Sequence, residues 1–129
     1  MPAGDAFTAD QLREIDRAVQ EAERISGREF SVHVGHVGDD SRRAAERLHS
    51  LLPHPDNSVL IQVDPVTRTL EIVTGTLVQQ GLSNRQAALA AISMQTSFAA
   101  GDLARGLRAG LQQLAESTTP VASLHTDTP

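Results

Sequence analysis

Cysteine, tryptophan, tyrosine and lysine are absent from this 129-residue chain, and phenylalanine occurs only three times. Without cysteine there are no disulfides, thiolate metal sites or thiol nucleophiles, and without lysine there is no Schiff-base chemistry and no P-loop. The shortage of aromatic rings removes the stacking surfaces that single-stranded nucleic acid needs. A net charge of −5 argues against nucleic acid as well, because phosphate binding requires positive charge.

Long apolar runs are also missing. No run reaches the roughly 18 residues that a membrane-spanning helix needs, and the first residues lack the regions of a signal peptide. We therefore expect no membrane span and a cytoplasmic location. The 40% apolar content suits one ordinary core. We predict a single domain over residues 7–116, between a flexible N-terminus at 1–6 and a polar, disordered tail at 117–129.

The first half of the chain predicts a helix, a strand and a second helix. Thr8 and Gln11 have the spacing of a capping box, and apolar residues then follow the 3.6-residue period until Gly27. Alternating apolar and polar residues over 29–37 predict a half-buried strand. A short amphipathic helix follows and ends at Pro53.

The second half predicts a hairpin and two helices. Residues 58–63 are apolar on nearly both faces, which indicates a central strand, and 70–74 form its antiparallel partner after a turn. A helix that starts after Ser83 is apolar around much of its circumference, so we expect it to be largely buried. The last helix carries Gly106 and Gly110 one turn apart, which lets another element approach closely.

The predicted order of elements is α-β-α-β-β-α-α. A three-stranded or slightly larger sheet layered with helices is the economical way to bury their apolar faces. We therefore predict a fold of the α/β class.

The hairpin and the two closing helices resemble the TPM domain, a family shared by a thylakoid phosphatase-like protein, photosystem II repair proteins and a nematode receptor modulator. The segments that carry the resemblance are 56–63, 68–75, 98–102 and 106–110. It covers about residues 7–116 and is closest to a short, uncharacterised actinobacterial branch. The resemblance implies a three-layer α/β/α sandwich with a small mixed sheet. Relatives in this family have divalent-metal binding, acid phosphatase or scaffolding roles.

Asp56, Asn57 and Asp102 are the candidate metal ligands. A hairpin that turns near Pro65 brings Asp56 and Asn57 close to Gly75, and the resemblance adds Asp102 to that site. Their carboxylate and amide oxygens suit Ca²⁺ or Mg²⁺. The alternative interpretation is structural, because Asp56 and Asn57 also suit a turn and Asp102 also suits a helix cap.

Two further groups of residues offer weaker metal sites. Asp39 and Asp40 either bind a cation or favour the positive end of the next helix. Four histidines suggest zinc, because imidazole is its usual nitrogen ligand: His33, His36, His49 and His54. His33 and His36 are three positions apart, however, so a strand would point them to opposite faces. The second predicted helix also carries three arginines, which either bind an anion or form a solvated helix face: Arg42, Arg43 and Arg47.

Departures from the TPM pattern decide the predicted function. The family usually has an aromatic residue after Gly-Asp, where this chain has Leu103, and an acidic residue that is missing from 75–81. No Gly-x-Ser-x-Gly motif is present. We predict a non-catalytic binding or interaction module with an unknown protein partner, as a monomer or weak homo-oligomer. The alternative is a divalent-metal-dependent acid phosphatase with Asp56, Asn57 and Asp102 around a cation.

Overall fold

The computed structural model describes residues 7–118, and its elements follow the predicted order. They are α1 (Ala9–Ser26), β1 (Glu29–Val34), α2 (Ser41–Ser50), β2 (Ser58–Asp64), β3 (Thr69–Thr74), α3 (Asn84–Ala99) and α4 (Leu103–Thr118). Short 3-10 turns at Pro55–Asn57 and Val78–Gln80 lie on either side of the hairpin. Helix α4 continues to Thr118, beyond the predicted end of the domain. The predictions for 1–6 and for 119–129 lie outside the described residues.

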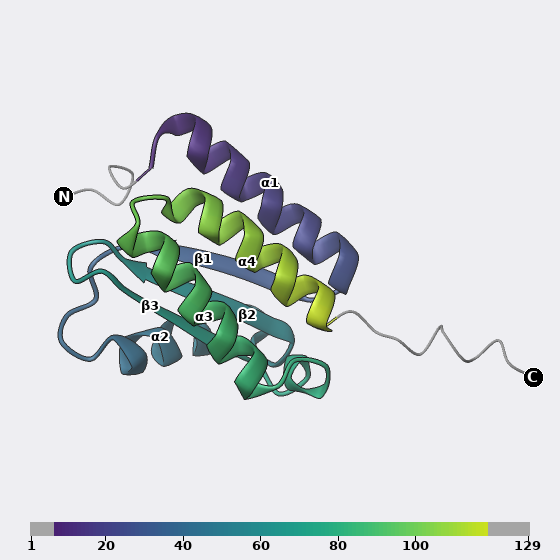
Figure 1. The fold of residues 1–129 in the computed structure, drawn as a ribbon. Coiled ribbons are helices and arrows are strands. Elements are labelled where there is room, and N and C mark those ends of the chain that lie inside the picture. The colour runs from purple at the N-terminus through teal and green to yellow at the C-terminus, as the bar shows by residue number, and fades with distance from the viewer. Residues whose placement is uncertain (1–6, 119–129) are drawn as a thin grey trace, which may run out of the picture.

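The three strands form one mixed sheet with β2 in the centre. β1 pairs with β2 in parallel, and β3 pairs with β2 antiparallel. Every residue of β2 is buried, as its apolar run predicts. Helices α1, α3 and α4 cover one face of the sheet and α2 covers the other (Figure 1). The three layers and the mixed sheet confirm the predicted α/β class.

Two hydrophobic clusters fill the spaces between these layers. The larger one lies under α1, α3 and α4 and takes Val59, Ile61 and Val63 from β2. The smaller one lies under α2 and consists of Ala45, Leu60 and Val73 with flanking leucines. The alternation of β2 residues between the clusters follows from the two-residue period of a strand.

Local capping signals place the helix ends where the sequence predicts them. Thr8 and Gln11 form a complete capping box at the start of α1, and Gly27 ends that helix in the left-handed conformation. Ser83 and Gln86 form a second complete box at the start of α3. These short-range bonds satisfy backbone N–H groups that have no partner within the helix.

Helices α3 and α4 pack closely, as the two glycines predict. A side chain at Gly106 would overlap Ser97, and one at Gly110 would overlap Met94. Between residues 7 and 118, no helix is both long enough and apolar enough to cross a membrane.

Candidate functional site

Asp56 and Asn57 lie in the 3-10 turn before β2, next to the end of β3. The backbone N–H of Leu77 donates to the Asp56 carbonyl at 2.9 Å, and Gly75 N–H donates to the Ser58 carbonyl at 3.0 Å. Gly75 has no room for a side chain, because the backbone carbonyls of Pro55 and Asp56 occupy that space. The hairpin thus brings Asp56 to Gly75, as predicted from the sequence.

The guanidinium of Arg28 contacts one of the candidate metal ligands in this turn. Its Nη1 donates to Asn57 Oδ1 at 2.8 Å, and Asn57 Nδ2 donates to the Gly27 carbonyl at 3.2 Å. The Asn57 side chain therefore has both polar atoms paired within the protein. A positive guanidinium at this distance repels a second cation. Sequence reasoning missed Arg28, which lies 29 positions before Asn57.

Asp102 lies at the other end of the sheet. It directly precedes α4, and its Oδ2 is 3.8 Å from Arg105 Nη1. Gly101 and Leu103, on either side of Asp102, line the same pocket as Arg68, which follows β2. Asp56 and Asn57 lie at the opposite end, because they precede β2. The seven residues of β2 span about 20 Å at roughly 3.3 Å each. The structure therefore does not bring Asp102 together with Asp56 and Asn57.

Each of the four candidate zinc ligands contacts a different partner. His33 Nδ1 lies 2.6 Å from Gln62 Oε1, and His36 Nδ1 lies 2.9 Å from Asp64 Oδ2. His49 Nε2 lies 3.0 Å from the Ser58 carbonyl oxygen, and His54 Nδ1 lies 2.7 Å from Glu29 Oε2. Over residues 7–118 the structure contains no group of three or more His, Asp or Glu side chains arranged to hold a metal ion.

The expectation that His33 and His36 point to opposite faces of one strand is wrong. β1 ends at Val34, so the alternation of side chains stops before His36. The partners of both histidines, Gln62 and Asp64, are two residues apart on β2 and therefore share the face toward α2.

Asp64 is a buried carboxylate at the end of β2. Its Oδ1 accepts from the N–H groups of Val66 and Thr67, as is typical of an aspartate that begins a turn, and its Oδ2 accepts from the N–H of Val37. Burial alone would raise the pKa of Asp64, but these backbone hydrogen bonds, together with His36, hold that pKa below its ordinary value. Asp64 thus joins the loop after β1 to the hairpin turn.

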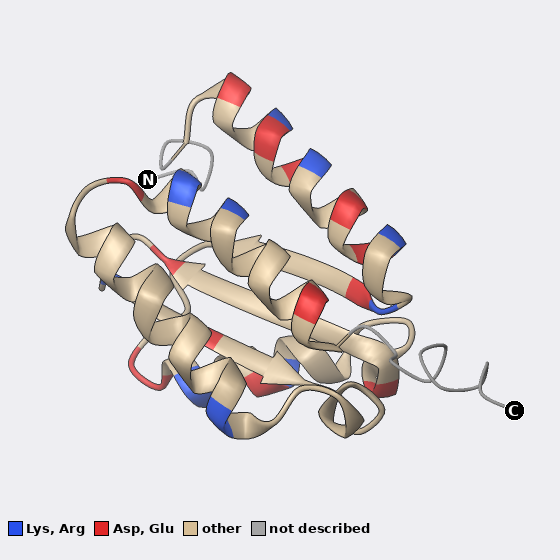
Figure 2. Ribbon diagram, turned by 45° about the vertical axis from the view of Figure 1, so that its right-hand side comes forward, with Lys and Arg blue, Asp and Glu red and all other residues tan. Residues whose placement is uncertain are grey.

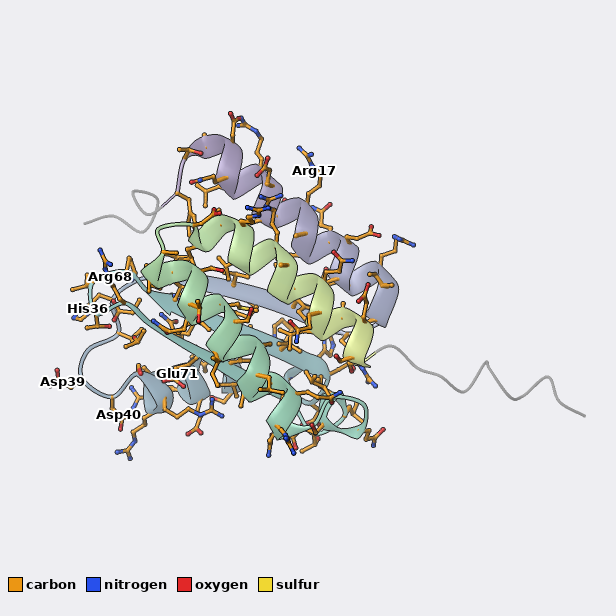
Figure 3. All side chains as sticks on the ribbon, in the orientation of Figure 1. Arg17, His36, Asp39, Asp40, Arg68 and Glu71 are labelled. Atoms are coloured by element: carbon orange, nitrogen blue, oxygen red, sulfur yellow. The ribbon has the colours of Figure 1, made fainter. Side chains whose placement is uncertain are left out.

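The two acidic residues before α2 lie on the outside of the molecule. Asp40 caps the helix, since its Oδ1 accepts from the backbone N–H of Arg43 at 3.0 Å. Figure 3 shows Asp39 and Asp40 pointing away from the body of the protein. In the first turn of α2, Arg42 has partners within the protein. Its Nη1 donates to the Ile72 carbonyl at 2.7 Å, and its Nε lies 3.2 Å from Glu46 Oε2.

A groove runs along the free edge of β3, between that strand and α3. Its volume is about 360 Å³. The lining residues come from β3, from the first three turns of α3, from Arg42 of α2 and from Gln79 of the second 3-10 turn, and they include Leu70, Ile72, Thr74, Ala88 and Ile92. Glu71 lies at the margin nearest α2, where its Oε2 accepts from the Ser41 hydroxyl at 2.9 Å (Figure 3).

Helix α3 departs from its prediction, because it is not largely buried. Only Ala87, Ala90 and Met94 are buried, whereas Leu89 is 53% exposed and Ile92 is 63% exposed. One helix of a three-layer sandwich contacts the sheet along a single stripe, so Leu89 and Ile92 on its outer side lie outside the core.

The outer surface of α3 also lacks charge. Arg85 is the only charged residue among its 16, whereas α1 has eight charged residues among 18. Figure 2 shows this contrast, with red and blue alternating along α1 and blue only near the start of α3. An exposed face with apolar residues and no charge is typical of a surface that binds another protein.

Comparisons with known proteins found a matching family, relatives of similar sequence and solved structures of similar fold. The family model DUF5130, described as a domain of unknown function, matches residues 2–115. Two uncharacterized proteins from Mycobacterium tuberculosis strains, CDC 1551 / Oshkosh and H37Rv, are 27% identical over 114 residues, which cover 88% of this chain and 68% of each relative.

Two solution structures have a similar fold. The BA42 protein of Bizionia argentinensis has a TM-score of 0.75 at 23% identity and covers 87% of this chain and 81% of its own. The N-terminal domain of a Corynebacterium glutamicum protein has a TM-score of 0.70 at 15% identity, with coverage of 88% and 74%. At these identities the likeness shows the fold alone.

Proposed function

The chain belongs to the DUF5130 family of domains of unknown function, and on that premise we propose that it is a non-catalytic interaction module that binds a protein partner. The observation that carries this proposal is the outer face of α3. It exposes Leu89 and Ile92 without any charged residue after Arg85, and it adjoins the groove at the edge of β3. Burial of such a face removes apolar surface from water at little cost in charge desolvation.

We also propose that this domain is related to the TPM domain family. The α/β/α layers, the hairpin and the Gly-Asp turn before α4 support that relation. A scaffolding role, which TPM relatives have, agrees with the exposed α3 face. The phosphatase role needs Asp56, Asn57 and Asp102 around one cation, and these residues lie at two ends of β2.

Site-specific photocrosslinking in the native host tests the interaction module. A photoreactive residue at Ile92 is expected to give adducts of defined mass, and the Ala88→Arg substitution in the same chain is expected to abolish them. Arg17 is the matched control position, because it points away from the molecule on the charged helix α1 (Figure 3). Equal adducts from Ile92 and Arg17 would contradict the proposal.

An enzyme assay tests the alternative. We expect no turnover of a generic phosphomonoester such as p-nitrophenyl phosphate with Ca²⁺, Mg²⁺ or Mn²⁺. Turnover by the wild-type chain that the Asp56→Ala variant loses would replace the interaction module with a metal-dependent phosphatase.

A further inference from the structure

We propose that the groove between β3 and α3 binds an extended segment of a partner protein, which pairs with the free edge of β3 as a fourth strand. This inference rests on the proposed interaction module and specifies its partner. Strand addition of this kind obtains affinity from main-chain hydrogen bonds and specificity from alternate side chains.

The hydrogen-bond pattern of the hairpin leaves one edge of β3 free. Gly75 N–H donates to the Ser58 carbonyl, and bonded pairs recur at every second residue of an antiparallel ladder. In the observed register, Val73 and Glu71 therefore exchange backbone bonds with β2. Ile72, which lies between them, directs its N–H and its carbonyl away from β2.

Side chains, and not another strand, bind two of the outward carbonyls of β3. The Ile72 carbonyl accepts from Arg42 Nη1 at 2.7 Å, and the Thr74 carbonyl accepts from Gln79 Nε2 at 3.0 Å. Arg42 and Gln79 are both exposed, so water can replace these bonds when the side chains move aside. A charged side chain such as that of Arg42 also protects a free edge from nonspecific pairing. A matching segment has to displace Arg42 from the Ile72 carbonyl.

Helices border this edge on both sides. Ala88 and Ile92 of α3 line one side of the groove, and Arg42 of α2 lines the other. Leu70 and Ile72 are only 8% and 6% exposed although they belong to an edge strand. The edge of β3 between these two helices is where we expect the extended segment to pair. A second copy of this domain is a poorer occupant, because its own α2 and α3 would enter the same space.

The walls of the groove define the chemistry of the segment. Its residues that point toward α3 meet Ala87, Ala88, Ala91 and Ile92, so they must be uncharged and apolar. Its intervening residues face Arg42 and the margin formed by Glu71, so they are polar. The expected partner is thus a segment with apolar and polar residues in strict alternation, without proline at its centre.

Peptide titration followed by amide chemical shifts of the labelled protein tests this proposal. The probe is an acetylated nine-residue peptide that alternates valine with threonine. One matched peptide has N-methyl groups on its valines, and the other has them on its threonines. Only alternate N–H groups of an added strand face β3, so we expect one methylated peptide to lose binding and the other to keep it.

Protein variants locate the binding site. The unmodified peptide is expected to shift the amide signals of Leu70, Ile72 and Thr74. Ala88→Arg is expected to weaken binding at least about tenfold, because it places a charge against the apolar residues of the segment. Arg42→Ala is expected to strengthen binding several-fold by freeing the Ile72 carbonyl, and Arg17→Ala is the neutral control.

Three results would overturn strand addition. The first is that both methylated peptides bind like the unmodified one while Ala88→Arg still weakens binding, which refutes strand pairing but retains an interaction module on α3. The second is that the unmodified peptide leaves the β3 amide signals unchanged. The third is a concentration-dependent dimer in light scattering that Ala88→Arg abolishes, since a second copy would then occupy the groove.

Discussion

Gly110 of α4 faces Met94 of α3 so closely that a methyl group on Gly110 would overlap the methionine side chain. Met94 is fully buried, and Gly110 is buried beside it. The two helices therefore meet at a point where one of them has no side chain. This contact positions α3, and with it the groove beside β3.

The first prediction concerns this contact. Gly110→Ala is expected to lower the free energy of unfolding by up to about 2 kcal/mol, because overpacking costs roughly 1–3 kcal/mol and better helix propensity returns about 1. Urea unfolding monitored by circular dichroism measures the change. In a Met94→Ala background the same substitution is expected to stabilise the protein, since the overlap is gone. A loss of equal size in both backgrounds would refute the packing argument.

The second prediction concerns Asp64 and pH. Its carboxylate is buried and hydrogen-bonded, and its pKa in the folded protein is lowered. Its stabilising effect is therefore complete above the unfolded pKa of about 3.9 and is lost as the pH falls through the folded pKa. Between pH 6 and pH 2 the wild type is expected to lose more stability than Asp64→Asn. Parallel stability curves for the two proteins would contradict this assignment.

At neutral pH, Asp64→Ala is expected to cost about 2 kcal/mol, because backbone N–H groups lose their acceptor. The side chain of His36 is half-exposed, so His36→Ala is a suitable comparison that removes one partner of the carboxylate and leaves the backbone bonds in place.

The third prediction concerns the turn at Asp56 and Asn57. Isothermal titration of the wild type with Ca²⁺, Mg²⁺ or Mn²⁺ is expected to give no saturable heat, because the Arg28 guanidinium is bound to Asn57. Arg28→Gln removes that positive charge and is the variant in which weak cation binding is expected. Saturable binding by the wild type that Asp56→Ala abolishes would revive the metal hypothesis.

The fourth prediction concerns Arg68, the only residue other than glycine with a positive φ among those that the structure describes. Its φ of 57° is in the left-handed region, where residues with a Cβ are strained by about 1 kcal/mol or more. Arg68→Gly is expected to raise the free energy of unfolding by roughly 0.5 kcal/mol, after the entropy cost of glycine. Thr67→Gly, at the neighbouring position, is the control and is expected to destabilise the turn.

Local patterns of sequence were sufficient for most of the secondary structure. The boxes at Thr8 and Ser83 start their helices, and the apolar run in β2 becomes a strand buried on both faces. Prediction was poorest where one element meets another. The strand expected over 29–37 ends at Val34, and α3 is more exposed than its composition indicates.

The sequence by itself determined the order of elements, their caps and the close contact at Gly106 and Gly110, because these depend on residues a few positions apart or on the absence of a side chain. Only the tertiary structure decided which polar groups meet. Arg28 reaches Asn57, Arg42 reaches Ile72 and His36 reaches Asp64, each across 28 to 30 positions. Such pairs depend on how the strands align and how the helices pack, and no local pattern contains that information.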